Sequence, residues 1–459
     1  MTEVIFLCAV LGVLLQGVHL SEAEINNVKA KHVTARFGDD IMSWLTLDEG
    51  VLATENTPVY GLVEEPKVSV NQPGYQIIEH KDAMKNIIAY WRKNKPDAFT
   101  TPSNNKAPKA NQEQSTVVKN KIPGEPARPK NVTEINEEIS QMLKMNHWKS
   151  NIKCQIIRTT SKPYPSIVYP EIFVIVDNAL FKKLGSNVRD VVTHVLAYWN
   201  GVDMLFRNLE SPKFRFNIKA ILIVEVPTSF PKLEYIPERI HPDQVILILG
   251  RWLYRYQRAF PIDSYDIAVL MTSNMLYASE TRWRYTGKSY LGGACKTLHE
   301  LELVAKTISV GETHLFLTIP YMAHQLGYSL GAFNYELDEE CPWQYETEWS
   351  QCNLDGLTQS FATDNLSCLY NEIQEQGTAI PRLLPGKLFE PKKNCDDLQS
   401  NTTFIKYEDN CTKFNCWHQP RSDGSQSGVE YNHGLFDGTS CGQGKICLLG
   451  KCVQENLMN

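Results

Sequence analysis

The stretch that decides the fold is HQLGYSLGAFN, residues 324–334. Apolar residues recur at helical spacing through the preceding residues and predict a helix over 315–330. His324 and Tyr328 are four residues apart, so they lie on the same face of this helix. Gly331 is expected to end the helix, because glycine readily adopts the left-handed conformation found after a last helical turn.

The chain before this helix alternates between strand and helix signals. Runs of apolar residues predict strands at 172–176, 218–226, 245–249 and 267–271. An amphipathic helix is expected over 187–205, with Ser186 or Asn187 as its N-cap. This order is typical of an α/β fold.

The region before residue 164 is less regular. Short strands are expected at 32–47 and 68–78, the second interrupted by a Pro73-Gly74 turn. Residues 93–132 are rich in Lys, Asn, Pro, Gln and Ser, and this composition predicts a linker.

Three further stretches accompany the helix: DIAVLMT at 266–272, GKSYLGGAC at 287–295 and CNLDGLTQS at 352–360. Together with 324–334 they resemble the adamalysin (reprolysin) branch of the metzincin zinc metalloproteases, whose zinc motif is H-E-x-x-H-x-x-G-x-x-H. The resemblance implies an α/β fold with a mixed sheet and an active-site helix. It also implies that 287–295 is the substrate-binding edge strand.

The tail at 383–453 is similar to the cysteine-rich module of the ADAMs with thrombospondin motifs. Secreted salivary and venom metalloproteases of arachnids, ticks in particular, have this layout. Residues 1–23 are expected to be a signal peptide, and the resemblance implies a pro-region at 24–163, a metalloprotease domain at 164–377 and a cysteine-rich, disintegrin-like module at 378–459.

The chain differs from the family at the positions of the zinc ligands and the general base. The resemblance places His324 at the first zinc-ligand position and Gln325 at the position of the general base. Tyr328 and Asn334 stand at the other two ligand positions, and Gln359 is placed at the methionine of the Met-turn. Only His324 matches the family residue.

These replacements remove the expected catalysis. A neutral Gln325 amide cannot accept a proton from water, and loss of a general base alone lowers a rate by about 10²–10⁴. Tyr328 would bind a metal only as phenolate, since the ordinary pKa of tyrosine is about 10, and the Asn334 amide is a poor zinc ligand. We therefore expect no cofactor and a pseudoenzyme. His324 and Tyr328 are expected to hydrogen-bond each other and fill the former metal pocket.

Two alternatives stay open. The first is an active zinc endopeptidase whose metal has moved to other side chains, for which the candidates are His299, His314, Glu336, Asp338, Glu339 and Glu340. The second is a structural or storage component of a secretion.

Several features indicate export. Residues 4–15 are almost continuously apolar and precede small residues that favour signal-peptide cleavage after Ala23. Later apolar runs are too short for a transmembrane segment. Sequons for glycosylation stand at Asn131, Asn365, Asn401 and Asn410. The net charge of −6 disfavours binding to nucleic acid.

The chain has 12 cysteines, and seven of them lie beyond residue 367, as in a disulfide framework. The resemblance implies the pairs Cys295–Cys368 and Cys341–Cys352. The remaining six have no assigned pairing: Cys395, Cys411, Cys416, Cys441, Cys447 and Cys452. Cys154 only faintly resembles the family's pro-region cysteine switch. The Arg-Ser-Asp-Gly stretch at 421–424 is expected to be an ordinary turn.

These observations predict a secreted, catalytically inactive protein that binds extracellular proteins, host proteins among them. A peptide could add as a strand to the former substrate cleft at 287–295.

Overall fold

The computed structural model describes residues 34–35, 51–64, 75–94, 115–118, 139, 164–226, 239–277, 284–311, 316–332, 349–362, 365–371, 377–380, 382–388, 395, 402–406, 410–418, 427–431 and 434–455. We call the described residues up to 118 the N-terminal segment, those from 164 to 371 the main domain, and those from 382 to 455 the C-terminal module. The expected signal peptide and the cleavage site after Ala23 lie outside the described residues.

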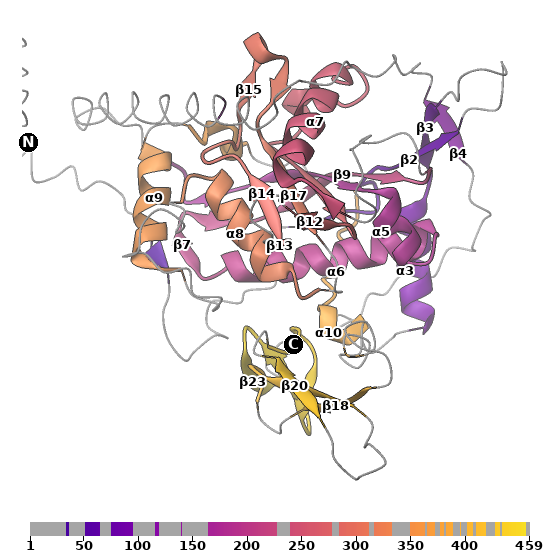
Figure 1. The fold of residues 1–459 in the computed structure, drawn as a ribbon, viewed down its shortest axis with the longest axis vertical. Coiled ribbons are helices and arrows are strands. Elements are labelled where there is room, and N and C mark those ends of the chain that lie inside the picture. Colours follow the sequence, from indigo (N-terminus) through magenta and orange to yellow (C-terminus); the bar gives the residue numbers. More distant parts are fainter. Residues whose placement is uncertain are drawn as a thin grey trace, which may run out of the picture.

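One eight-stranded sheet runs through the N-terminal segment and the main domain (Figure 1). Its middle strands are parallel: β17 (Thr307–Gly311), β11 (Ile267–Thr272), β6 (Glu171–Val176), β9 (Asn217–Val224) and β2 (Val59–Glu64). The antiparallel strand β14 (Gly287–Ser289) forms one edge. The antiparallel strands β3 (Tyr75–His80) and β4 (Ser115–Val118) complete the other. The strands predicted at 172–176, 218–226 and 267–271 are confirmed as β6, β9 and β11.

Apolar side chains on both faces of the sheet make two core layers. Ile172, Val174 and Val176 of β6 belong to one cluster, which includes α6 (Val188–Phe206) and α8 (Ile319–Ser329). Phe173 and Ile175 point the other way, into a cluster that includes α7 (Pro242–Arg255). Because successive strand residues face opposite sides and both sides are buried, this strand is apolar from Ile172 to Val176. The helix predicted over 187–205 is confirmed, with Asn187 as its N-cap.

The strand predicted at 245–249 is wrong, since these residues lie in helix α7. The His241 side chain caps this helix, and Pro242 occupies its first turn. Val245 and Leu249 pack toward the sheet, whereas Ile246 and Leu247 are buried in a separate cluster with Leu303. Burial on two sides makes the run continuously apolar, and such a short run does not distinguish a strand from a buried helix.

The N-terminal segment is part of the sheet. A linker was predicted over 93–132, but residues 115–118 form strand β4, which pairs with β3. The prediction is wrong there because a stretch within a polar region can still pair its backbone with the edge of an existing strand. The strand expected at 68–78 is described from Tyr75 onward, as β3. Of the strand expected at 32–47, the described part is β1 (Thr34–Ala35), which pairs with β7 (Leu209–Ser211). The boundary expected between 163 and 164 therefore does not divide two separate sheets.

Shorter elements complete the described fold. The helices are α3 (Ala83–Asn94), α5 (Asn178–Lys183), α9 (Gln351–Ala362) and α10 (Pro385–Leu388). The remaining strands of the main domain are β5 (Ile167–Val168), β8 (Lys213–Phe214), β10 (Arg239–Ile240), β12 (Met275–Tyr277), β13 (Arg284–Tyr285), β15 (Thr297–Leu298) and β16 (Leu303–Val304).

The C-terminal module contains two three-stranded antiparallel sheets. The first consists of β18 (Thr402–Lys406), β19 (Phe414–His418) and β20 (Gly428–Tyr431); the second of β21 (Ser440–Gly442), β22 (Lys445–Leu448) and β23 (Lys451–Gln454). The disulfides that the sequence left open are Cys395–Cys416, Cys411–Cys447 and Cys441–Cys452. Cys411–Cys447 links the segment before β19 to β22, and the cysteines form a small core together with Phe414 and Leu435.

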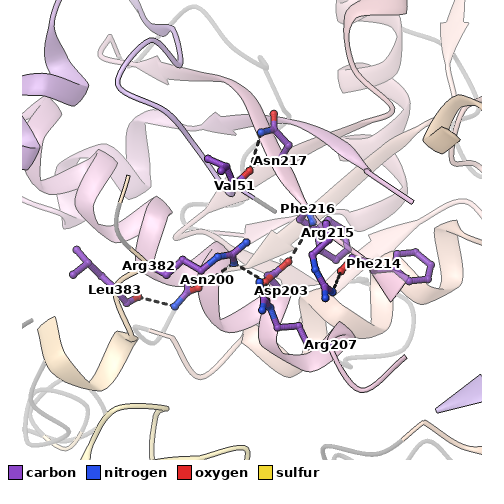
Figure 2. A network of polar contacts seen from close by, with 10 residues as sticks. All are labelled: Val51, Asn200, Asp203, Arg207, Phe214, Arg215, Phe216, Asn217, Arg382 and Leu383. Atoms are coloured by element: carbon purple, nitrogen blue, oxygen red, sulfur yellow. Dashed lines mark hydrogen bonds and ion pairs between the residues drawn. The ribbon is translucent and has the colours of Figure 1, made fainter. Parts of the chain in front are cut away.

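A buried ionic network joins α6 to the chain that leads into this module (Figure 2). The carboxylate of Asp203 accepts hydrogen bonds from Arg207 Nε at 2.7 Å and Arg382 Nη1 at 2.6 Å. Its other oxygen accepts from the backbone N–H of Phe216 at 3.2 Å. Asn200, one turn earlier on α6, donates to the carbonyl of Leu383 at 3.0 Å. The network thus fixes α6 against both β9 and the approach to the module.

Two neighbouring positive charges explain why the Asp203 carboxyl is ionised although its side chain is fully buried. Burial by itself would raise the pKa of this carboxyl. The positive charges of Arg382 and Arg207, with their hydrogen bonds, outweigh burial and hold the pKa below its ordinary value of 3.8.

Apolar contacts complete the attachment of the module. Met204 of α6 clusters with Leu384, Ile446 and Leu448. Within the described residues, no helix combines the length and the apolar character needed to cross a bilayer.

We predict that Asp203→Ala lowers the free energy of unfolding by about 3–5 kcal/mol, because it leaves two buried guanidinium groups without their counter-charge. Asp190→Asn on the same helix is the control. It removes the exposed ion pair with Arg189 but keeps an oxygen that can accept the hydrogen bond from the Asn187 side chain, so we expect a change below about 1 kcal/mol. Because the pKa of Asp203 is lower in the folded state, its stabilisation should be complete at neutral pH and disappear as the pH falls below about 4. Urea titrations at neutral and acidic pH measure both effects, and equal changes for the two variants would contradict this assignment.

Candidate functional site

Helix α8 carries the candidate site, and its ends are well defined. The helix predicted over 315–330 begins later than expected, at Ile319, with Pro320 in its first turn. It ends at Ser329, and Gly331 follows with a φ of +97°. The backbone N–H of Ala332 donates to the Gly327 carbonyl at 2.8 Å, which is the hydrogen bond of a Schellman motif. The expected terminator Gly331 is therefore confirmed.

The two faces of α8 differ in burial. Met322, Ala323 and Leu326 are buried and pack into the core. The opposite face is half-buried and holds Tyr321, His324, Gln325 and Tyr328, which are spaced three or four residues apart. Tyr321 was missed by the sequence argument, although its spacing of three residues from His324 places it on this face.

Gln325 lies against the edge strand β14. The Ser289 hydroxyl lies 2.7 Å from Gln325 Oε1 and 3.1 Å from the Gln325 backbone carbonyl, and it donates to these oxygens. A Cβ at Gly287 would be 2.8 Å from Gln325 Cγ and 3.0 Å from the Ser309 carbonyl oxygen. Gly287 thus permits Gln325 to pack over the strand. Ser289 therefore contacts the candidate site, although the sequence did not single it out within 287–295.

The loop after β14 holds the end of α8. The backbone N–H of Gly292 donates to the Tyr328 carbonyl at 3.1 Å, and that of Ala294 donates to the Ser329 carbonyl at 3.0 Å. These carbonyls belong to the last helical turn, where carbonyl groups have no N–H partner four residues further along the helix. The disulfide Cys295–Cys368, implied by the family resemblance, is present directly after this loop. The helix and the edge strand therefore form one rigid frame.

Burial also determines the charge of His324. It lowers the pKa of His324 from 6.5 to about 4, so the imidazole is neutral at neutral pH. Asn334 lies outside the described residues. The hydrogen bond expected between His324 and Tyr328 stays a prediction.

The assignment of Gln359 to a Met-turn is wrong, because this residue lies within helix α9. Leu354, Leu357 and Phe361 are buried at helical spacing along α9, and the Ser350 hydroxyl accepts from the Asn353 N–H at 3.3 Å at its start. The Asp-Gly pair at 355–356 therefore lies inside a helix and does not form a turn. The side chain of Ser360 instead meets Gly331, where a Cβ would lie 2.0 Å from Ser360 Oγ.

Few candidates for a relocated metal site fall on the described residues. His299 is exposed in a short 3₁₀ helix, and its Nδ1 is 3.4 Å from the Tyr254 hydroxyl. His314, Glu336, Asp338, Glu339 and Glu340 lie outside the described residues. In the described part of the chain, the sulfurs of Cys411, Cys441 and Cys452 lie close enough together for a metal. All three are in disulfides, so they are not thiolate ligands.

The predicted modification sites are described in part. Asn365 accepts a hydrogen bond from Lys296 Nζ at 2.8 Å, and Asn410 accepts from the N–H of Thr412 at 2.8 Å. Asn131, Asn401, Cys154, Cys341 and the stretch 421–424 lie outside the described residues, and so does the side chain of Cys352. Glycosylation and the Cys341–Cys352 pair stay predictions.

Comparison with known families agrees with this architecture. Residues 168–376 match the reprolysin (M12B) family of zinc metalloproteases, and residues 385–453 match the ADAMTS cysteine-rich domain 2. The chain therefore contains a reprolysin-type metzincin domain followed by a disulfide-rich C-terminal module, as the sequence predicted.

The individual relatives that the chain resembles are also named as metalloproteinases. The chain is 30% identical over 324 residues to an "A disintegrin and metalloproteinase with thrombospondin motifs like" protein of Bombyx mori, covering 64% of this chain and 45% of that protein. It is 28% identical over 184 residues to venom metalloproteinase 2 of Eulophus pennicornis, covering 38% and 41%. Human "A disintegrin and metalloproteinase with thrombospondin motifs 20" is 22% identical over 373 residues, covering 70% and 17%. The chain thus spans less than half the length of each of these proteins.

We predict that Gly331→Ala destabilises the fold more than Gly292→Ala. Both glycines have positive φ, at +97° and +63°, but a Cβ at Gly292 meets nothing within 4 Å. Gly292→Ala should therefore lower the free energy of unfolding only by the backbone strain of about 1–2 kcal/mol. Gly331→Ala adds a clash with Ser360 and should lower it further. Denaturant titration measures the difference, and an equal loss for both variants would show that α9 does not constrain the end of α8.

Proposed function

We propose that this chain is a secreted, catalytically inactive relative of the reprolysin-type proteases that acts by binding extracellular proteins. The hydrogen bond between the Ser289 hydroxyl and Gln325 Oε1 carries the proposal. Peptide hydrolysis on this fold requires an ionisable carboxylate at that position, as the family resemblance implies. Gln325 instead presents an amide oxygen, which has no basicity at neutral pH and is already engaged as an acceptor.

The donor set on α8 supports the loss of zinc. A catalytic zinc site uses three protein ligands and an open position for water. His324 supplies one neutral imidazole, whereas Tyr328 supplies a phenol that stays protonated at neutral pH unless a metal displaces its proton. Asn334 adds a neutral amide. These residues do not fit a catalytic zinc ion.

The open edge of β14 favours binding of an extended peptide. Gly311 N–H donates to the Thr286 carbonyl at 2.9 Å, and Lys288 faces Ser309 in the next hydrogen-bonded position of the pair. The alternation in an antiparallel pair then directs the N–H groups of Gly287 and Ser289 away from β17. No other described strand pairs with β14 on that side. An extended peptide can add there as a further strand, beside the half-buried face of α8.

Secretion is part of the proposal. The relatives include proteins named as venom metalloproteinases, and the disulfides of the C-terminal module are typical of an oxidising compartment. The partners would be extracellular proteins, with host proteins as one class if the chain belongs to an arachnid secretion.

Activity measurements on restored variants test the loss of catalysis. We expect the native chain and Gln325→Glu to leave unfolded casein intact, with or without a chelator. The triple variant Gln325→Glu, Tyr328→His, Asn334→His should gain one zinc and chelator-sensitive cleavage, because the supporting frame is intact. Chelator-sensitive cleavage by the native chain would contradict the proposal, and equal cleavage by the triple variant would then indicate that the metal lies on other residues.

Binding measurements test the edge strand. The matched variants are Ser289→Pro and Ser289→Ala, which both lose the hydroxyl, although only proline removes the outward N–H. We expect the native chain and Ser289→Ala to bind reduced, alkylated casein saturably in surface plasmon resonance, and Ser289→Pro to lose this binding. Circular dichroism checks that both variants are folded. Equal binding by the two variants would exclude β14 as the binding edge, and no saturable binding by the native chain would favour a structural or storage role.

A further inference from the structure

The N-terminal segment covers the strand edge that the main domain would otherwise expose. β2 pairs in parallel with β9 through Val59–Leu62 against Ile221–Val224. Backbone hydrogen bonds continue at both ends of this pair: Ile218 N–H donates to the Leu52 carbonyl at 2.7 Å, and Glu225 N–H donates to the Leu62 carbonyl at 3.1 Å. Without this segment, β9 would be an edge strand with unpaired backbone groups and a continuous buried apolar run at Ile221–Val224, and such edges are sites of aggregation in globular proteins.

The segment also contributes to both core layers. On one face, α3 adds Ala83, Met84, Ile87, Ile88 and Trp91 to the cluster that contains α6. On the other face, Leu62 and Ile77 join the cluster that contains α7. Trp91 and Ile87 are each 1% exposed, so removing α3 would leave a large apolar surface on α6 open to water.

Polar contacts attach the segment at two further places. His80 Nε2 lies 2.7 Å from Glu225 Oε1, at the end of β9. The Asn217 side chain donates to the Val51 carbonyl at 2.9 Å (Figure 2). These contacts secure both ends of the pairing between β2 and β9.

The same segment reaches the chain that leads to the C-terminal module. Thr54 and Ala379 form an antiparallel bridge. Ile380 N–H donates to the Ala53 carbonyl at 2.9 Å, and Glu55 N–H donates to the Thr378 carbonyl at 3.0 Å. Residues 51–55 thus lie between the main domain and the start of the path to the module.

From these contacts we infer that residues 51–118 are a permanent part of the main domain and not a removable pro-segment. A proteolytic cut between residue 118 and the main domain would then leave two fragments that remain bound through β2, β3 and α3. The surface formed by β9 and α6 is the binding site, and its partner is the chain's own N-terminal segment. The inference is independent of whether the cleft hydrolyses peptides.

A cleavable full-length chain tests the inference. A recognition sequence for tobacco etch virus protease is inserted between residues 124 and 125, and complete cutting is verified on a denaturing gel. Size-exclusion chromatography and native mass spectrometry then examine the cut protein in native buffer. We expect a single species with both fragments in equal amounts, which separates only at urea concentrations that unfold the main domain. An N-terminal fragment that elutes alone in native buffer, while the rest keeps its circular dichroism spectrum, would overturn the inference.

A matched pair of variants on α3 links this result to the described interface. Ile87→Ala removes a buried contact with the α6 side, whereas Lys93→Ala changes an exposed residue of the same helix. In the cut protein, Ile87→Ala should lower the urea midpoint for fragment release, and Lys93→Ala should leave it unchanged. An unchanged midpoint for Ile87→Ala would show that α3 does not hold the fragment, which would contradict the interface described above.

Discussion

The buried carboxylate of Asp203 is the constraint on which the arrangement of the molecule depends. It binds Arg207 on its own helix, Arg382 on the path to the C-terminal module and the backbone just before β9. Two guanidinium groups can be enclosed there only because one ionised carboxylate faces both. Helix α6 is thereby fixed, and α8 rests on it: a Cβ at Gly201 would lie 2.7 Å from Ile319 Cδ1, and the Tyr198 hydroxyl lies 3.0 Å from Thr318 Oγ1.

The arrangement of α8 and β14 depends on one set of residues, and the chemistry of the half-buried face of α8 depends on another. The position of α8 follows from its apolar side chains, from Gly331 and from the loop that caps its last turn, and these contacts use no side chain at a ligand position: the hydrogen bond from the loop to Tyr328 is made to its backbone carbonyl. The side chains at the positions that the family resemblance assigns to the ligands and the base therefore do not determine where the helix lies. Under the proposed function, this separation is what lets a reprolysin-type domain keep its edge strand and its helix without a zinc site on the helix face.

Local patterns were sufficient to predict much of this fold from the sequence. The amphipathic stripe and cap of α6, the glycine after α8 and the buried strands β6, β9 and β11 all follow from residue spacing. Helix α7 was missed because its residues 245–249 are continuously apolar, and so short a run does not distinguish a strand from a buried helix. Gln359 was misplaced because a short Cys…Asp-Gly resemblance outweighed the helical spacing of Leu354, Leu357 and Phe361. The pairing of β2 with β9 is non-local, and the polar composition after residue 93 concealed the short strand that completes the sheet. At the site, Ser289 carried no motif, since its role comes only from the packing of Gln325 over β14.

The central claim is that the residues on α8 do not hold a catalytic zinc ion. The measurement that tests it most directly is the zinc content of the purified, secreted chain by plasma mass spectrometry after dialysis against micromolar zinc. The account predicts a zinc content far below one ion per chain. About one tightly held zinc per chain, lost together with activity on treatment with a chelator, would contradict it and would place the metal on donors outside the residues described on this helix.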